Sequence, residues 1–241
     1  MPFASFTAGS ASHWSVILVF LSYLALTVWA HRHDPRSALA RWTRGILIFL
    51  NLTAATSTVA SHYYSGLTED LDNLLPLHLC DVMGFVAAFA LLSRHPLLCE
   101  LTYYLGLGAT LQGLLTPNLP YDYPHPVFFS FFQLHAAVVG AALLLPLGDG
   151  WRPRRPLWKS ILRVILISDL YLLTVYFLNL RLDTNFAFVM HKPENPSLFD
   201  HLGPHPWYLL TVQALAILVM ALLSLPFISR RQSRRPGAPA L

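Results

Sequence analysis

A few ionisable residues of this chain lie within or beside long apolar segments, where such side chains are rare. His78 and Asp81 are three residues apart, a spacing that places two side chains on one face of a helix. His135 and Asp169 lie inside two further apolar segments. Because a titratable group within a membrane is costly and by default marks a functional site, we take His78, Asp81 and His135 as candidate catalytic residues.

Three kinds of chemistry fit these residues. A histidine activated by a carboxylate can carry out acid–base catalysis on a lipid. The same three side chains could bind a metal ion, but their spacing matches no known metal-binding motif, so we predict no metal site. Asp81 and Asp169 could instead form a proton or solute pathway. The sequence shows neither the internal repeats nor the broken helices typical of transporters, which disfavours that interpretation.

Further polar residues are predicted to contact a substrate. They are Gln112, His125, Asp169, Asn185 and Lys192. A plainer alternative exists, because a polar side chain in a helical bundle often only bonds a neighbouring helix. That alternative applies most readily to His62 and Gln112. It is weaker for Asp81 and Asp169, since a carboxylate costs more to bury.

The composition is that of a membrane protein. Hydrophobic residues make up 55% of the chain and charged residues 12%, which is about half the charged share of a soluble protein. A soluble fold with so few charges would expose large apolar patches. The net charge of +4 comes without a basic stretch interleaved with aromatic residues, so we predict no nucleic-acid partner. The two cysteines form no disulfide framework, and the sequence indicates no particular cofactor.

Seven stretches are apolar enough to cross a bilayer, which takes about 20 residues. They are Trp14–Ala30, Gly45–Tyr64, Leu77–Leu92, Leu98–Leu115, Val127–Leu147, Ser160–Leu180 and Trp207–Ile228. The first lacks the basic start and the cleavage site of a signal peptide, so we expect a retained helix. The predicted fold is an all-α, seven-helix transmembrane bundle over residues 1–229, followed by a basic, disordered cytoplasmic tail over residues 230–241.

The distribution of charge between the loops predicts the orientation. Every Lys and Arg except Arg181 and Lys192 lies in the first, third or fifth loop, just inside the sixth span, or in the tail. Because cytoplasmic loops are enriched in basic residues, we predict an N-terminus outside and a C-terminus in the cytoplasm. The candidate residues then lie mainly in the outer half of the bundle, where they would form an outward-facing polar pocket.

Several segments resemble one family. Leu75–Asp81 reads LPLHLCD and is similar to a signature of the YwaF-like family of bacterial integral membrane proteins. Further similar positions are Gly113–Asn118, Tyr123–His125, Phe132, His135, Asn185, Lys192–Pro193, Ser197–Leu198 and Gly203–Tyr208. Together they extend over roughly residues 75 to 208. The resemblance implies a multi-pass protein of a bacterial cytoplasmic membrane, with the lipid bilayer as its partner and a phospholipid as its substrate.

That family is related to the eukaryotic transmembrane protein 164, and the relation implies an activity. It would be an acyltransferase that moves a polyunsaturated acyl chain onto an ether-linked lysophosphatidylethanolamine, with a cysteine nucleophile just before the motif histidine. This chain has Leu77 at that position, so the family's nucleophile does not carry over. His78, His125 and His135 remain available for acid–base chemistry, and Cys80 is predicted to be a small core residue.

The sequence therefore predicts a membrane-embedded enzyme that acts on lipid acyl chains, as an acyltransferase or an acyl hydrolase. Two alternatives remain open at this point. The protein could be a non-catalytic binder or carrier of a small or lipid-like ligand, which would agree with the lack of a complete catalytic signature. It could also be a structural membrane protein, whose polar residues only join neighbouring helices.

Overall fold

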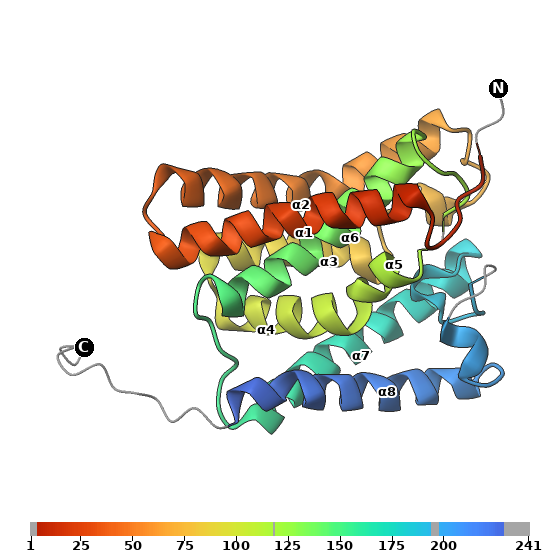
Figure 1. The fold of residues 1–241 in the computed structure, drawn as a ribbon. Coiled ribbons are helices and arrows are strands. Elements are labelled where there is room, and N and C mark those ends of the chain that lie inside the picture. Colours follow the sequence, from red (N-terminus) through yellow and green to blue (C-terminus); the bar gives the residue numbers. More distant parts are fainter. Residues whose placement is uncertain (1–3, 118, 194–197, 229–241) are drawn as a thin grey trace.

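The structure, a computed structural model, describes residues 4–117, 119–193 and 198–228, and every regular element within them is helical (Figure 1). The α-helices are α1 (Ala11–His33), α2 (Ala38–Tyr64), α3 (Leu79–Ser93), α4 (Pro96–Leu105), α5 (Leu111–Leu115), α6 (Pro126–Leu147), α7 (Leu157–Leu182) and α8 (Trp207–Ser224). A π-helix, η2 (Gly106–Thr110), joins α4 to α5. The short 3₁₀ segments are η1 (Leu71–Asn73), η3 (Phe186–Phe188), η4 (Leu198–His201) and η5 (Leu225–Phe227).

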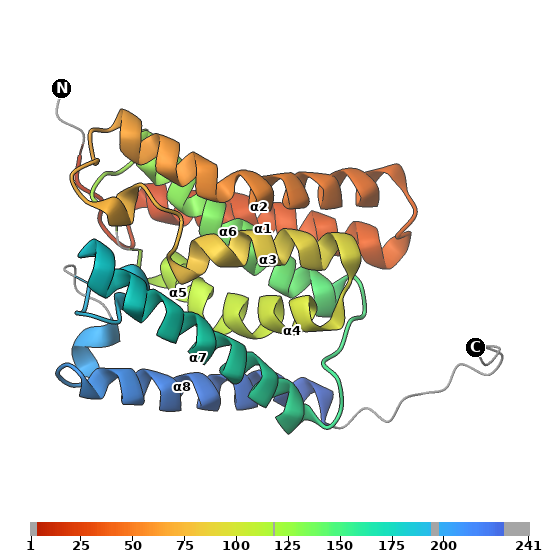
Figure 2. The same ribbon diagram turned by 180° about the vertical axis from the view of Figure 1, so that it is seen from behind.

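The helices run back and forth between two ends of the molecule, with α4, η2 and α5 forming one pass (Figures 1 and 2). Five helices, α1, α2, α6, α7 and α8, are long and apolar enough to cross a membrane. Helix α3 has only 15 residues, or about 22 Å at 1.5 Å per residue, which is less than the hydrocarbon core of roughly 30 Å. The predicted all-α architecture is confirmed. The predicted tail, residues 230–241, lies outside the described residues.

Local sequence signals account for several helix starts. The Ser10 hydroxyl accepts a hydrogen bond from His13 N at the start of α1, and Ser37 caps α2 in the same way. Pro96 and Pro126 occupy the first positions of α4 and α6, where a residue without an N–H costs nothing. These caps fix where the passes begin, and thereby the depth of the side chains that follow.

Helix α6 lies at the centre of the bundle, against α1, α2, α3 and α4. Its inner face carries small residues, including Ala137, Ala141 and Ala142, all fully buried. Small residues allow helices to approach closely in lipid. A Cβ added at Gly106 would lie 2.9 Å from the Cβ of Ala142, so the approach of η2 to α6 depends on glycine at that position.

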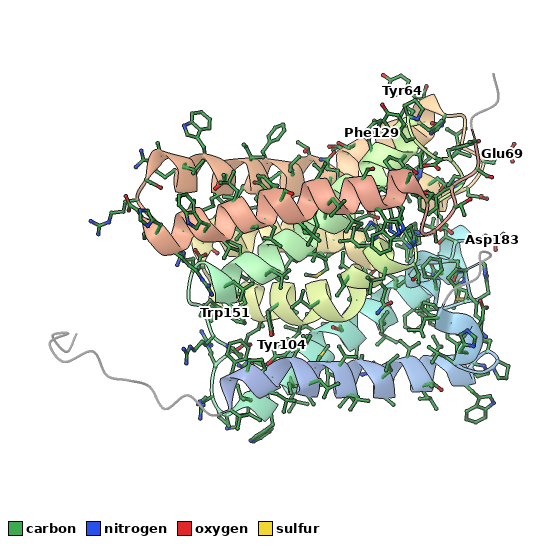
Figure 3. The ribbon with its side chains drawn as sticks, in the orientation of Figure 1. Tyr64, Glu69, Tyr104, Phe129, Trp151 and Asp183 are labelled. Carbon is green, nitrogen blue, oxygen red and sulfur yellow. The ribbon has the colours of Figure 1, made fainter. Side chains whose placement is uncertain are left out.

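The two ends of the bundle differ in charge. Asp149, in the loop after α6, is buried between Arg44 and Arg94 at 2.8 and 2.9 Å. Figure 3 shows Trp151 at this end, with Glu69 and Asp183 at the opposite one. The predicted separation of basic from acidic loops is therefore present in the fold. Which end faces the cytoplasm stays a prediction.

Candidate functional site

A cavity of about 820 Å³ lies between α2, α3, η2, α5 and α6 on one side and α7 and α8 on the other. Its walls are mainly apolar, and this volume lies within the range of small-molecule sites. Side chains with polar groups reach it from several elements: Thr58, His62, Asp72, Asn73, His78, Cys80, Asp81, Gln112, Thr116, Ser130, His135, Ser168, Tyr176 and Gln213. The cavity therefore combines room for an apolar ligand with a limited set of reactive groups.

His78 and Asp81 lie together at the start of α3. His78 is the residue that caps the helix, and the Asp81 carboxylate accepts a hydrogen bond from His78 N at 3.2 Å. Asp81 N donates in turn to the backbone carbonyl of His78 at 3.0 Å, and the two bonds close the first turn of the helix. Asp81 is buried and its carboxylate is engaged with the backbone, so it holds the first turn in place in addition to lining the cavity.

The partner of the His78 ring defines its tautomer. Nδ1 accepts a hydrogen bond from Ala187 N at 3.4 Å, and the ring packs against Phe186 and Phe188 with centroids 5.4 Å away. A backbone N–H can only donate, so Nδ1 carries no proton. The neutral ring must then carry its proton on Nε2. His78 is thus able to donate a hydrogen bond from Nε2.

The opposite tautomer follows for His135. Its Nδ1 lies 2.8 Å from the carbonyl oxygen of Phe131, and a carbonyl only accepts, so Nδ1 carries the proton and Nε2 has a free lone pair. The ring stacks on Phe131 at 4.1 Å. A Cβ at Gly113 would lie 2.0 Å from His135 Cδ2, so glycine at that position gives the ring its space. The unprotonated Nε2 lies on the edge of the ring that packs against Gly113.

Cys80 packs against the main hydrophobic core, as expected of a small core residue, and it also lines the same cavity. It lies in the first turn of α3, two residues after His78, and beside Thr110 of the π-helix. Cys99, in contrast, is fully buried in α4, with its sulfur 3.9 Å from Ala90 O. A signal for Cys80 was present in its position next to His78 and Asp81. In the family that the sequence resembles, the nucleophile position corresponds to Leu77 of this chain.

The π-helix forms part of the cavity wall. Ala109 lines the cavity. The next residue, Thr110, is fully buried, and within the described part of the chain its hydroxyl has no partner at a normal hydrogen-bond distance and angle. π-helical turns inside α-helices occur frequently at functional sites. The widened turn directs Gln112 and Gly113 of α5 to the cavity, facing α6.

The predicted site residues divide into two groups. His78, Asp81, Gln112 and His135 line the cavity, whereas His125, Asp169, Asn185 and Lys192 do not. Asp169 is exposed on α7 and accepts a hydrogen bond from Gln213 on α8. The cavity thus brings together the three residues predicted to be catalytic. Their roles, and those of the other five, stay predictions.

Three of the outlying residues order the loops at the acidic end. His125 caps α6 by accepting from Val127 N at 3.2 Å, and burial lowers its pKa. The Asn185 side chain binds backbone groups of the same loop, including the carbonyl of His191 at 2.9 Å. Lys192 lies over the ring of Tyr208 at 5.9 Å. Each of them holds the loops around the cavity.

A metal centre finds no support in the geometry. Within the described ranges, no three or more His, Cys, Asp or Glu side chains come together in a way that could hold a metal ion. His78, Asp81 and His135 therefore share a cavity without forming a ligand set.

Comparison with known proteins gives one result. A model of the TMEM164 family matches residues 8–224, which includes all eight α-helices and the whole cavity. No curated protein sequence and no solved structure is significantly similar to the chain.

Proposed function

Since the chain belongs to the TMEM164 family, and since its cavity joins an apolar interior to a few reactive groups, we propose that this multi-pass membrane protein is an enzyme acting on lipid acyl chains. The observation that carries the proposal is the common location of Cys80, His78 and His135. A thiol, a hydrogen-bond donor and a proton acceptor are the three groups that acyl transfer through a covalent intermediate requires.

The proposed reaction begins with an ester-linked phospholipid in the cavity. The Cys80 sulfur attacks the ester carbonyl while His135 Nε2 takes the thiol proton. The His78 Nε2–H donates to the carbonyl oxygen, on which negative charge develops. The carbon–oxygen bond then breaks, and His135 returns the proton to the departing alcohol. A lysophospholipid and a Cys80 thioester result.

The second half of the reaction mirrors the first. The hydroxyl of another lysophospholipid attacks the thioester carbonyl, and His135 Nε2 accepts its proton. The thiolate leaves and recovers that proton, so the protein returns to its starting state. Water in place of the lysophospholipid would release a fatty acid, which corresponds to the acyl hydrolase. Gln112, which also lines the cavity, is proposed to contact the polar part of the lipid.

The activity is tested with purified protein in lipid nanodiscs. Transfer of a labelled acyl chain from phosphatidylcholine to lysophosphatidylethanolamine is measured for the wild type, Cys80→Ala and Cys99→Ala. We expect turnover in the wild type and in Cys99→Ala, and its loss in Cys80→Ala, with all three proteins equally stable. The two cysteines form a matched pair, because only one of them reaches the cavity.

The same assay separates the alternatives. Equal turnover in the Cys80→Ala variant would remove the thiol from the mechanism and leave acid–base chemistry by His78 and His135. If no variant turns over lipid, while lipids still raise the melting temperature of the wild type, the protein is a binder or carrier. If there is no lipid turnover and lipids leave the melting temperature unchanged, the polar residues serve only to join helices.

A further inference from the structure

A polar pair on the lipid-facing surface is not explained by the proposed chemistry. Asp169 lies at the middle of the 26-residue helix α7, and it is exposed on the outside of the bundle. Its Oδ1 accepts a hydrogen bond from Nε2 of Gln213, on α8, at 3.1 Å. A carboxylate at the centre of a membrane span is costly and by default indicates a function. Asp169 does not line the cavity, so that function lies outside it.

Gln213 connects the cavity to the surface. Its side chain lines the cavity and also donates to the exposed carboxylate of Asp169. No side chain of α7 between Val164 and Val175 is buried, and the same holds for the middle of α8. Within the described segments, this hydrogen bond is the one side-chain bond that joins the two helices. A seam between α7 and α8 thus separates the cavity from the surrounding lipid.

Other bonds hold the two helices to the rest of the bundle near their ends. The Tyr208 hydroxyl, at the start of α8, donates to the carbonyl of Phe188. Near the other end of α8, the hydroxyls of Tyr104 and Ser224 lie 2.8 Å apart. Helix α7 is fixed near its start by the ion pair between Arg163 and the buried Glu100 on α4. These bonds, with the one that the Tyr171 hydroxyl donates to the carbonyl of Leu77, bind each helix to other elements. Asp169 and Gln213 bind the two helices to each other.

The surface beside the pair is apolar. Leu166, Leu170 and Leu173 on α7 and Leu210 on α8 are exposed large hydrophobic residues, which face the acyl chains of a bilayer. We infer that the seam between α7 and α8 is a side entrance, through which the acyl chain of a bilayer lipid reaches the cavity. The Asp169–Gln213 hydrogen bond closes this entrance. The inference rests on the proposed function for the chemistry inside, and it names a lipid of the bilayer as the substrate.

The energetics agree with a closure that opens readily. A hydrogen bond between helices in a membrane adds little stability, because separated polar groups find other partners there. A lipid ester or headgroup can provide such a partner while it passes. Asp169 and Gln213 would then contact the polar part of the passing lipid. The leucines beside them would contact its acyl chain.

The entrance is tested by photolabelling, which needs no turnover. The Cys80→Ala protein is placed in nanodiscs that contain phosphatidylcholine with a photoreactive group in one acyl chain. Adducts are mapped by mass spectrometry. Asp169→Cys and Gln213→Cys are then introduced together and bridged with a short bifunctional thiol reagent. We expect adducts on the cavity residues Ala109 and Leu134 to fall to the level seen without light, while adducts on Leu170 persist.

Each single-cysteine variant treated with the same reagent is the control, and we expect it to keep full cavity labelling. Cavity adducts that persist in the bridged protein would overturn the side entrance, because the lipid would then enter elsewhere. Cavity labelling that is already missing without the bridge would overturn it too. The proposed chemistry can fail separately: if the wild type shows no turnover but labelling still depends on the bridge, the entrance stands.

A second variant tests the closing bond itself. Gln213→Leu removes the donor and leaves an apolar side chain that is shorter by one atom. We expect the rate of cavity labelling to rise about threefold, the ratio equivalent to about 0.6 kcal/mol for one hydrogen bond between membrane helices. Thr211→Leu, a polar-to-apolar change on the exposed side of the same helix, is the matched control. An unchanged rate in Gln213→Leu would contradict the assignment of this bond as the closure.

Discussion

The roles of individual residues follow here from their backbone partners. His78 and His135 are both histidines in one cavity, yet Ala187 N–H makes Nδ1 of the first an acceptor and the Phe131 carbonyl makes Nδ1 of the second a donor. The sequence predicted both as site residues. It could not assign the tautomer of His78, because Ala187 is far from His78 along the chain, whereas the partner of His135 lies four residues away on the same helix.

The two tautomers predict different responses to the same substitution. A glutamine amide can replace a donor at Nε2, but it cannot act as a proton acceptor. We expect His78→Gln to keep a substantial part of the acyl-transfer activity, and His135→Gln to lose about 10²- to 10⁴-fold, the range of general base catalysis. Activity is measured under saturating lipid. An equal loss in both variants would contradict the division of roles.

The space beside His135 gives a second prediction for a single residue. Gly113→Ala would place a Cβ 2.0 Å from the imidazole, and overpacking of this kind costs about 1–3 kcal/mol. We expect a lower melting temperature and lower activity. Gly45→Ala on α2 is the control, since nothing lies within 4 Å of its added Cβ, and it should stabilise the helix by about 0.5–1 kcal/mol. Equal effects would show that the His135 ring moves freely.

Among the elements, the predicted spans correspond well to the helices, because hydrophobicity and capping residues are local properties. The expected fourth span, Leu98–Leu115, is instead divided into α4, the π-helix and α5. This division could not be predicted, since Gly106 and Thr110 belong to an apolar stretch that reads as ordinary helix. The widened turn forms where Gly106 packs against Ala142 of α6, and that is a tertiary contact.

The ion pairs at the basic end give a prediction for the elements. The Asp149 side chain is 2% exposed and bonds Arg44, whose side chain is 16% exposed, so removal of the carboxylate leaves the mostly buried charge of Arg44 without this partner. We expect Asp149→Asn to lower the unfolding free energy by roughly 1–3 kcal/mol, less than for a fully buried pair because solvent screens part of it. Glu69→Gln, at an exposed position, is the control. Thermal unfolding in detergent measures this loss of stability. Matching melting temperatures for the wild type and Asp149→Asn would count against a structural role for Asp149.

For the whole molecule, the alternation of basic and acidic loops predicted a sidedness that agrees with the two ends of the fold. The cavity lies toward the acidic end, since residues such as Asp72, Leu119 and Pro193, from three loops of that end, contribute to its wall. Positive loops favour the cytoplasm. The cavity is therefore proposed to lie in the non-cytoplasmic half of the membrane.

This orientation is tested by labelling with a membrane-impermeant thiol reagent on intact cells. Glu69→Cys lies at the acidic end and Arg152→Cys at the basic end. We expect rapid labelling of the first in intact cells, and labelling of the second only after the membrane is opened. The reverse pattern would invert the molecule and place the cavity in the cytoplasmic half.

The central claim is that Cys80 carries an acyl group during the reaction. The most direct measurement is mass spectrometry of peptides from wild-type protein that was incubated with phospholipid and denatured at low pH, where thioesters persist. We predict an acyl adduct on Cys80 that hydroxylamine removes, with none on Cys99. Efficient turnover with no adduct on Cys80, or equal adducts on both cysteines, would contradict the account.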